Sequence, residues 1–135
     1  MVSAMASESD RVAREIVQSL NEHEPGAPFE SPITVVGRSG VRHSFSFGSK
    51  TNEGANVVGD IIFSSSPIDE TRILSLYIKV YDVGAKRAIL CALPSITPEA
   101  RKLSDLYSIA VVESPDEGEL AEMVSKTAQK HLKSH

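Results

Sequence analysis

Residues 56–64 have the sequence NVVGDIIFS, in which apolar side chains surround a single acid, Asp60. Such a run, without regular polar alternation, is typical of a strand that is buried on both faces of a sheet. A second run of this kind, RAILCAL at residues 87–93, follows after a spacer long enough for a helix. Two doubly buried strands separated by one helix predict a parallel pair with a right-handed crossover.

Three short motifs in the second half of the chain mark helix starts. Residues 66–69 (SPID), 97–99 (TPE) and 114–117 (SPDE) each place a hydroxyl and a proline before a carboxylate. At a helix start the hydroxyl caps free N–H groups, the proline needs no N–H partner, and the acid faces the positive end of the dipole. We therefore predict three helices, each with its N-cap at the hydroxyl residue.

Residues 74–80 on their own would fit a strand, because apolar and polar side chains alternate there. The capped start before them favours a helix over 68–83 instead, with Gly84 as its C-terminal stop. A short helix over 100–107 then leads to a third buried strand at 109–112. This half of the chain therefore alternates between helix and strand.

The first half predicts a helix followed by a β-hairpin. Apolar residues recur at helical spacing over residues 8–21, and a loop rich in proline follows. Residues 33–36 and 41–47 fit two strands joined by the turn GRSG at 37–40. Alternation in the second strand places His43 on one face with the aromatic residues.

The complete order, α-βββ-α-β-α-β-α, predicts an α/β fold of three layers, in which a mixed sheet has helices on both faces. The length of 135 residues fits a single domain over 1–135. No apolar run is long enough to span a membrane, so we expect no membrane partner. The single cysteine, Cys91, lies in a predicted buried strand, which favours a reducing, cytoplasmic location.

The net charge of −4 argues against binding of nucleic acid by the surface as a whole, because phosphate contacts require basic side chains. One stretch differs from the rest: residues 31–52 contain no acid and carry Arg38, Arg42, His43 and Lys50. Ordinary solvated charges on a hairpin would explain this pattern. The three arginine and lysine residues are also candidate contacts for a DNA or RNA backbone.

The predicted order of elements resembles that of the restriction endonuclease-like superfamily, the PD-(D/E)XK nucleases. Residues 82–90 (DVGAKRAIL), 94–101 (PSITPEAR) and 109–113 (IAVVE) are similar to the Mrr-type branch of that superfamily. The resemblance extends over about residues 35–113. It implies the restriction endonuclease-like fold and an association with nucleic acid.

In these nucleases two acids hold a divalent cation, commonly Mg²⁺, and a lysine two residues after the second acid acts on the attacking water. Asp60 resembles the acid of the third strand, but Ile62 occupies the lysine position. The place of the first acid is taken by His43 or Ser46. This alignment therefore lacks both the first acid and the lysine.

A second alignment takes Asp60 as the first acid and residues 77–79 (YIK) as the acid-x-lysine triplet, but Tyr77 has no carboxylate and Lys79 lies on a predicted helix. The resemblance thus implies a degenerate site, with Asp60 as candidate metal ligand and Asp60 and His43 as candidate catalytic residues. Both residues also fit structural roles. Asp60 could be satisfied by backbone donors or an arginine, and His43 could be a hydrogen-bonded histidine of the core or the edge.

Three functions are consistent with this pattern. The first is a degenerate nuclease-like domain that binds nucleic acid or a partner with little or no cleavage. An active Mg²⁺-dependent nuclease would use Asp60, His43 and an acid from elsewhere, such as Glu15 on the first helix. A homo-oligomeric scaffold would pair through an edge strand or the last helix. The sequence contains no Walker loop, no Gly-x-Ser-x-Gly and no His-Glu-x-x-His motif.

Overall fold

The structure is a computed structural model that describes residues 4–23, 28–52, 54–114 and 120–132. In chain order its elements are α1 (Ala4–His23), β1 (Phe29–Glu30), β2 (Ile33–Val36), β3 (Arg42–Phe45), β4 (Phe47–Thr51), β5 (Gly54–Phe63), α2 (Glu70–Val83), β6 (Arg87–Leu93), α3 (Pro98–Leu106), β7 (Ile109–Glu113) and α4 (Leu120–Leu132). No helix in these ranges is both long and apolar enough to cross a membrane.

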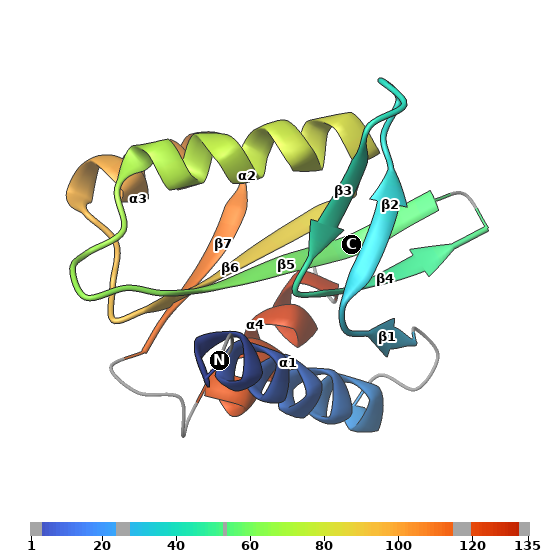
Figure 1. Cartoon of the computed structure of the whole chain (residues 1–135), viewed down its shortest axis with the longest axis horizontal. Helices are drawn as coiled ribbons and strands as arrows, with labels where there is room; N and C mark the ends of the chain where they lie inside the picture. Colours follow the sequence, from blue (N-terminus) through green and yellow to red (C-terminus); the bar gives the residue numbers. More distant parts are fainter. Residues whose placement is uncertain (1–3, 24–27, 53, 115–119, 133–135) are drawn as a thin grey trace.

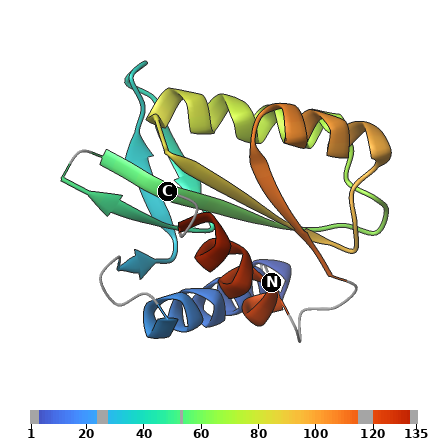
Figure 2. The ribbon, with the colours of Figure 1, turned by 180° about the vertical axis from the view of Figure 1, so that it is seen from behind.

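The molecule has three layers, as Figure 1 shows. The middle layer is a five-stranded sheet with the order β1-β4-β5-β6-β7. Helices α2 and α3 cover one face, and α1 and α4 cover the other; Figure 2 shows the same arrangement from behind. The prediction of an α/β fold with a mixed sheet and helices on both faces is confirmed. Strand β1 is additional to the predicted order.

Strand β5 is the centre of the sheet and its longest strand. It pairs antiparallel with β4 and parallel with β6, and Asp60 lies opposite Leu90 in the second pairing. Strand β6 pairs parallel with β7. The predicted parallel connections through α2 and α3 are therefore present, and residues 87–93 form the strand that their composition predicts.

Alternate side chains of β5 enter two separate cores. Val57 and Ile61 belong to the core on the α1 side, together with buried residues of α1 and α4. Val58 belongs to the core on the α2 side, together with Ile73 of α2. Because side chains alternate along a strand, Asp60 faces the same side as Val58. The one acid of the strand is therefore directed toward α2.

The β2–β3 hairpin leaves the main sheet, contrary to the prediction of one continuous strand over 41–47. Strand β3 ends at Phe45, β4 begins at Phe47, and Ser46 lies between them. Strands β2 and β3 form a separate two-stranded sheet that stands beside the C-terminal end of α2 (Figure 1). Phe45 enters the α2-side core and Phe47 the α1-side core, so the expectation of one shared aromatic face is wrong.

Helix α2 begins later than its serine-proline motif predicts. Asp69, and not Ser66, is the N-cap, and its carboxylate accepts the backbone N–H of Thr71 at 3.1 Å. Ile68 forms a parallel bridge with Ile96, which keeps the chain extended up to the cap. The helix ends as predicted, with Gly84 in the left-handed conformation.

The threonine-proline motif marks the start of α3 as predicted. Thr97 is the N-cap, and its hydroxyl accepts the backbone N–H of Ala100 at 3.1 Å. The third motif extends into residues 115–119, which lie outside the described residues. The local capping rule is therefore correct at α3 and is overridden at α2 by a bridge between distant residues.

Gly59 provides space that the sheet needs. It lies opposite Phe47 in the β4–β5 register, and the Phe47 side chain is fully buried. A Cβ atom on residue 59 would lie 2.2 Å from the Phe47 ring. The ring therefore occupies the position of the missing side chain.

Gly59→Ala should lower the free energy of unfolding by about 1–3 kcal/mol, because the added methyl group overpacks the core against Phe47. Urea denaturation of wild type and variant measures this difference. In a Phe47→Leu background the same substitution should cost less, because the smaller side chain leaves room. An equal cost in both backgrounds would contradict this explanation.

Candidate functional site

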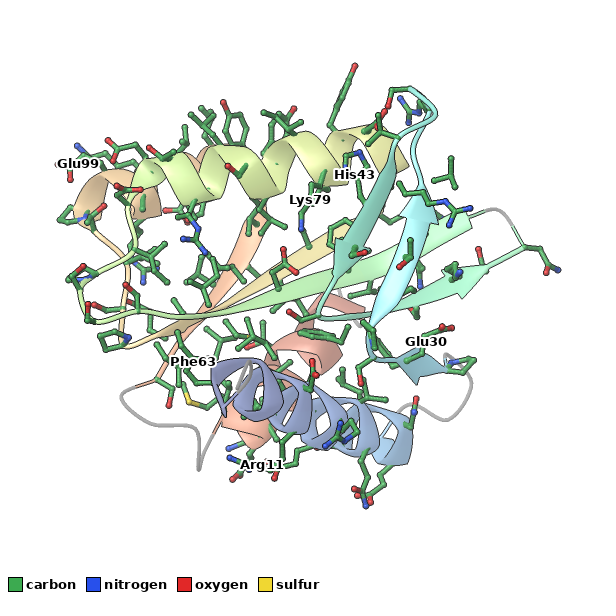
Figure 3. All side chains as sticks on the ribbon, in the orientation of Figure 1. Arg11, Glu30, His43, Phe63, Lys79 and Glu99 are labelled. Carbon is green, nitrogen blue, oxygen red and sulfur yellow. The ribbon has the colours of Figure 1, made fainter. Side chains whose placement is uncertain are left out.

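Asp60 lies where β5, α2 and the break between β3 and β4 meet. Its Oδ2 accepts a hydrogen bond from Lys79 Nζ at 2.7 Å, and its Oδ1 accepts the backbone N–H of Ser46 at 3.0 Å. Lys79 also donates to the carbonyl oxygen of Ser44 at 2.9 Å. Figure 3 shows the Lys79 side chain directed from α2 toward the sheet. The lysine thus joins the helix, the central strand and the hairpin.

The surroundings of this ion pair keep Lys79 in place. The side chains of Asp60 and Lys79 are only 19% and 27% exposed. The ammonium group also lies 4.6 Å from the centre of the Phe45 ring, within the range of a cation–π contact. The structural role considered for Asp60 therefore has a backbone donor, as expected, and a lysine in place of an arginine.

The hydroxyl of Ser46 completes the junction. It accepts the backbone N–H of Ile61 at 3.1 Å and lies 3.4 Å from Asp60 Oδ1. Ser46 is thus bonded to β5 through its backbone and its side chain at the point where the chain passes from the hairpin into β4. These bonds give the physical reason for the break in the predicted strand.

The residues around Asp60 do not fit a Mg²⁺ site. A magnesium ion requires carboxylate oxygens that are free to coordinate it, and it commonly uses one or two carboxylates together with phosphates and water. Both oxygens of Asp60 are already engaged, one of them by a cation. Over the described ranges, no group of three or more His, Cys, Asp or Glu side chains is placed to share a metal ion.

His43 bonds to a different acid from the one expected. Its Nε2 lies 2.8 Å from Oδ2 of Asp82 near the end of α2, and Figure 3 shows the ring beside that end of the helix. Strand β3 pairs with β2 and not with β5. The expectation that His43 and Asp60 lie on adjacent, paired strands is therefore wrong, and each of the two side chains has its own partner on α2.

Ser39 in the hairpin turn completes a second cluster around Asp82. Its hydroxyl donates to Oδ2 at 2.6 Å, and its backbone N–H donates to Oδ1 at 3.0 Å. These bonds, with that from His43, lower the pKa of Asp82 from 3.8 to about 2. The carboxylate therefore stays ionised and fastens the hairpin to α2.

Ser39, His43 and Asp82 are the residue types of a hydrolase triad, but they are connected in another order. In a triad the histidine lies between serine and aspartate and takes the serine proton. Here the aspartate lies between the other two, and the Nε2 of His43 is engaged by Asp82. The cluster therefore has the geometry of a clamp and not that of an activated nucleophile.

The three candidate nucleic-acid contacts occupy different places. The Arg38 guanidinium lies 5.7 Å from the centre of the Tyr81 ring on α2. Arg42 is exposed at the start of β3, and Lys50 on β4 donates to the carbonyl of Thr34 at 3.4 Å. The arginines belong to the hairpin, and the lysine lies on the main sheet, where it contacts the hairpin through Thr34 of β2.

Glu15 and Cys91 lie away from the face of the sheet on which Asp60 is found. Glu15, the acid considered for an active nuclease, pairs with Arg11 at 3.0 Å on α1, which covers the face of the sheet opposite to α2. Cys91 is fully buried, as expected, and burial raises the pKa of its thiol. Glu15 and Cys91 thus lie on the α1 side of the sheet, whereas the Asp60 side chain is directed toward α2.

Three side chains of the stretches that resemble the Mrr-type branch connect neighbouring elements in this chain. Arg101 on α3 forms an ion pair with Glu113 at the end of β7, and Glu113 also accepts the backbone N–H of Ile96 at 3.1 Å. These contacts join α3, the end of β7 and the connection between β6 and α3. Asp82, in the stretch 82–90, binds Ser39 and His43 of the hairpin. No such role for Asp82 is predicted from the sequence.

Lys79→Met should lower the free energy of unfolding by about 1–3 kcal/mol, because it leaves a partly buried carboxylate without its cation. In the Lys79→Met background, Asp60→Asn should lower the free energy of unfolding by less than it does in wild type. A double-mutant cycle by urea denaturation measures this coupling. Lys126→Met is the control. It removes an exposed lysine of α4 that pairs with Glu122, and it should change the free energy of unfolding little. Zero coupling between positions 60 and 79 would contradict the assignment.

Asp82 should make stability depend on pH at the acid end of the range. Its pKa is lower in the folded chain than in the unfolded chain, so its contribution is complete above about pH 4 and is lost as pH falls toward 2. Between these values Asp82→Asn should lose less stability than wild type, as measured by thermal unfolding. Asp105→Asn, a change at an exposed aspartate of α3, should keep the wild-type slope. An unchanged slope in Asp82→Asn would refute the clamp.

No protein-family model matches the sequence. No curated protein matches it either. The fold is similar to the crystal structure of a protein of unknown function, AF1548, with a TM-score of 0.61 and 15% sequence identity. The similarity covers 87% of this chain and 66% of that chain. At this identity the comparison shows a shared fold and nothing about activity.

Proposed function

We propose that this chain is a degenerate nuclease-like domain, related to the Mrr-type branch of the PD-(D/E)XK superfamily, which binds nucleic acid without cleaving it. One observation carries the proposal. The carboxylate that the resemblance assigns to the metal, that of Asp60, is held by Lys79 at 2.7 Å and by Ser46 at 3.0 Å. Its charge is used to hold the hairpin, the sheet and α2 together.

The arrangement of the elements supports the kinship. A helix is followed by antiparallel strands, and then α2, β6, α3 and β7 alternate, which is the order that the resemblance implies. The family lysine is absent from its position on β5. A lysine does reach the Asp60 carboxylate, but it comes from α2 and forms an ion pair with the acid.

Exposed basic residues support the binding part of the proposal. Arg38 and Arg42 are exposed on the hairpin, and Lys50 is exposed on β4, in a stretch of sequence that contains no acid. Contacts to phosphate need only accessible basic groups, whereas cleavage needs a complete site. A chain that has lost its complete catalytic site can therefore still bind phosphate groups.

Fluorescence anisotropy with labelled duplex DNA tests the binding part at about 50 mM salt. We expect binding that weakens with added salt. Arg42→Ala and Lys50→Ala should each reduce the slope of log K against log salt by about 0.9, while Lys126→Ala on α4 should leave the slope unchanged. Absence of binding at low salt would contradict the proposal and favour a scaffold, which the mass in solution would then test.

A plasmid-nicking assay with Mg²⁺ or Mn²⁺ tests the catalytic part. We expect no cleavage above the level of Asp60→Ala, because the carboxylate is engaged by Lys79. Metal-dependent nicking by the wild type that Asp60→Ala abolishes would show an active nuclease and overturn the assignment of a degenerate site.

A further inference from the structure

A pocket beside the C-terminal end of α2 contains all three tyrosines of the chain and three of its basic residues. Its volume is about 290 Å³. These six lining residues are Tyr77, Tyr81, Tyr107, Arg38, Lys86 and Arg87. The described residues that line the pocket include no acid, although the chain as a whole has a net charge of −4.

The three tyrosine rings form an aromatic surface that consists of a stacked pair and a third, more exposed ring. Tyr77 and Tyr107 stack with centroids 3.9 Å apart and an angle of 12° between their planes. Tyr81 lies 6.1 Å from Tyr77 at an angle of 37°, and it is 65% exposed. An aromatic ring that is so exposed contributes little to the core, and here it is available to a ligand.

Positive charge lies at the edge of the same surface. The Arg38 guanidinium is 5.7 Å from the centre of the Tyr81 ring, and the exposed Lys86 follows two residues after Gly84. A Cβ atom on residue 84 would lie 2.9 Å from a terminal nitrogen of Arg38. Gly84 therefore allows the hairpin arginine to approach the helix end and the pocket.

We infer that this pocket binds one unpaired nucleotide, with the base against the tyrosine rings and the phosphate near Arg38 and Lys86. The inference rests on the proposed function and adds to its basic surface a site that accepts a base only from single-stranded nucleic acid. Aromatic side chains stack on bases of any sequence, and basic groups beside them hold the backbone. Bases in a duplex are stacked on each other and would not reach the rings.

The size of the pocket agrees with one base. Sites for small molecules begin at about 300 Å³, and the volume here lies at that lower limit. A large dinucleotide cofactor would not fit, whereas a single base with its phosphate at the open rim would. A free mononucleotide offers the same ring and charge as one unit of a strand, so the test must distinguish the two.

Intrinsic fluorescence gives a direct measurement, because the chain has no tryptophan and all three tyrosines line this pocket. Titration with a short single-stranded DNA should change the tyrosine emission, after correction for absorbance. In parallel, Tyr81→Leu should weaken binding of the labelled single strand about 5- to 150-fold, which corresponds to the stacking of one base. Tyr81→Phe keeps the ring and should restore binding. Leu106→Ala, at an exposed apolar residue of α3, is the control and should have no effect.

The outcomes separate this inference from the proposed function. Binding of single strands without a change in tyrosine emission, or with full affinity in Tyr81→Leu, would overturn the pocket assignment and leave the basic surface in place. An equal loss of single-stranded and duplex binding in Tyr81→Leu would overturn it too. A change in emission with adenosine monophosphate that a single strand does not compete would show a site for free nucleotides and overturn the assignment to nucleic acid. Absence of all nucleic-acid binding would overturn both proposals.

Discussion

The ion pair between Asp60 and Lys79 is the constraint on which the arrangement of the layers depends. A carboxylate in the middle of a doubly buried strand is costly unless a charge or a set of donors satisfies it. Alternation along β5 directs this one toward α2, where Lys79 lies 2.7 Å away. The backbone N–H of Ser46 supplies the other bond, at the point where the chain leaves the hairpin. One acid therefore fixes the helix, the central strand and the crossing of the hairpin.

The hairpin is held at two places, and both contacts come from α2. Near its base, Lys79 bonds to the carbonyl of Ser44, and at its turn Asp82 bonds to Ser39. This double attachment brings Arg38 over the ring of Tyr81. Lys79, which engages the candidate metal ligand, thus also holds the hairpin whose Arg38 lines the basic and aromatic pocket. This is the physical link that the proposed function would require between absent cleavage and nucleic-acid binding.

Much of the fold could be predicted from the sequence because its signals are local. Residues 33–36 and 87–93 form strands with the predicted bounds, and Gly84 ends α2. The break at Ser46 could not be predicted, since alternation continues through it and its cause is a bond to a residue 14 positions away. The sequence did supply a signal for the partner of Asp60: its face on β5 and a lysine on the following helix. Lys79 is considered there only as the lysine of an acid-x-lysine triplet and is set aside because it lies on the helix, so its ion pair with Asp60 is missed.

The distribution of bound Mn²⁺ tests most directly whether Asp60 serves the structure or a cation. In ¹⁵N-labelled protein, Mn²⁺ broadens the amide signals of residues close to where it binds. If Lys79 holds the carboxylate, the signals of Ser46 and Ile61 should weaken no more than those of residues in the α1-side core, such as Val124. Selective broadening of Ser46, Asp60 and Ile61 at Mn²⁺ concentrations that leave the other signals unchanged would contradict this account.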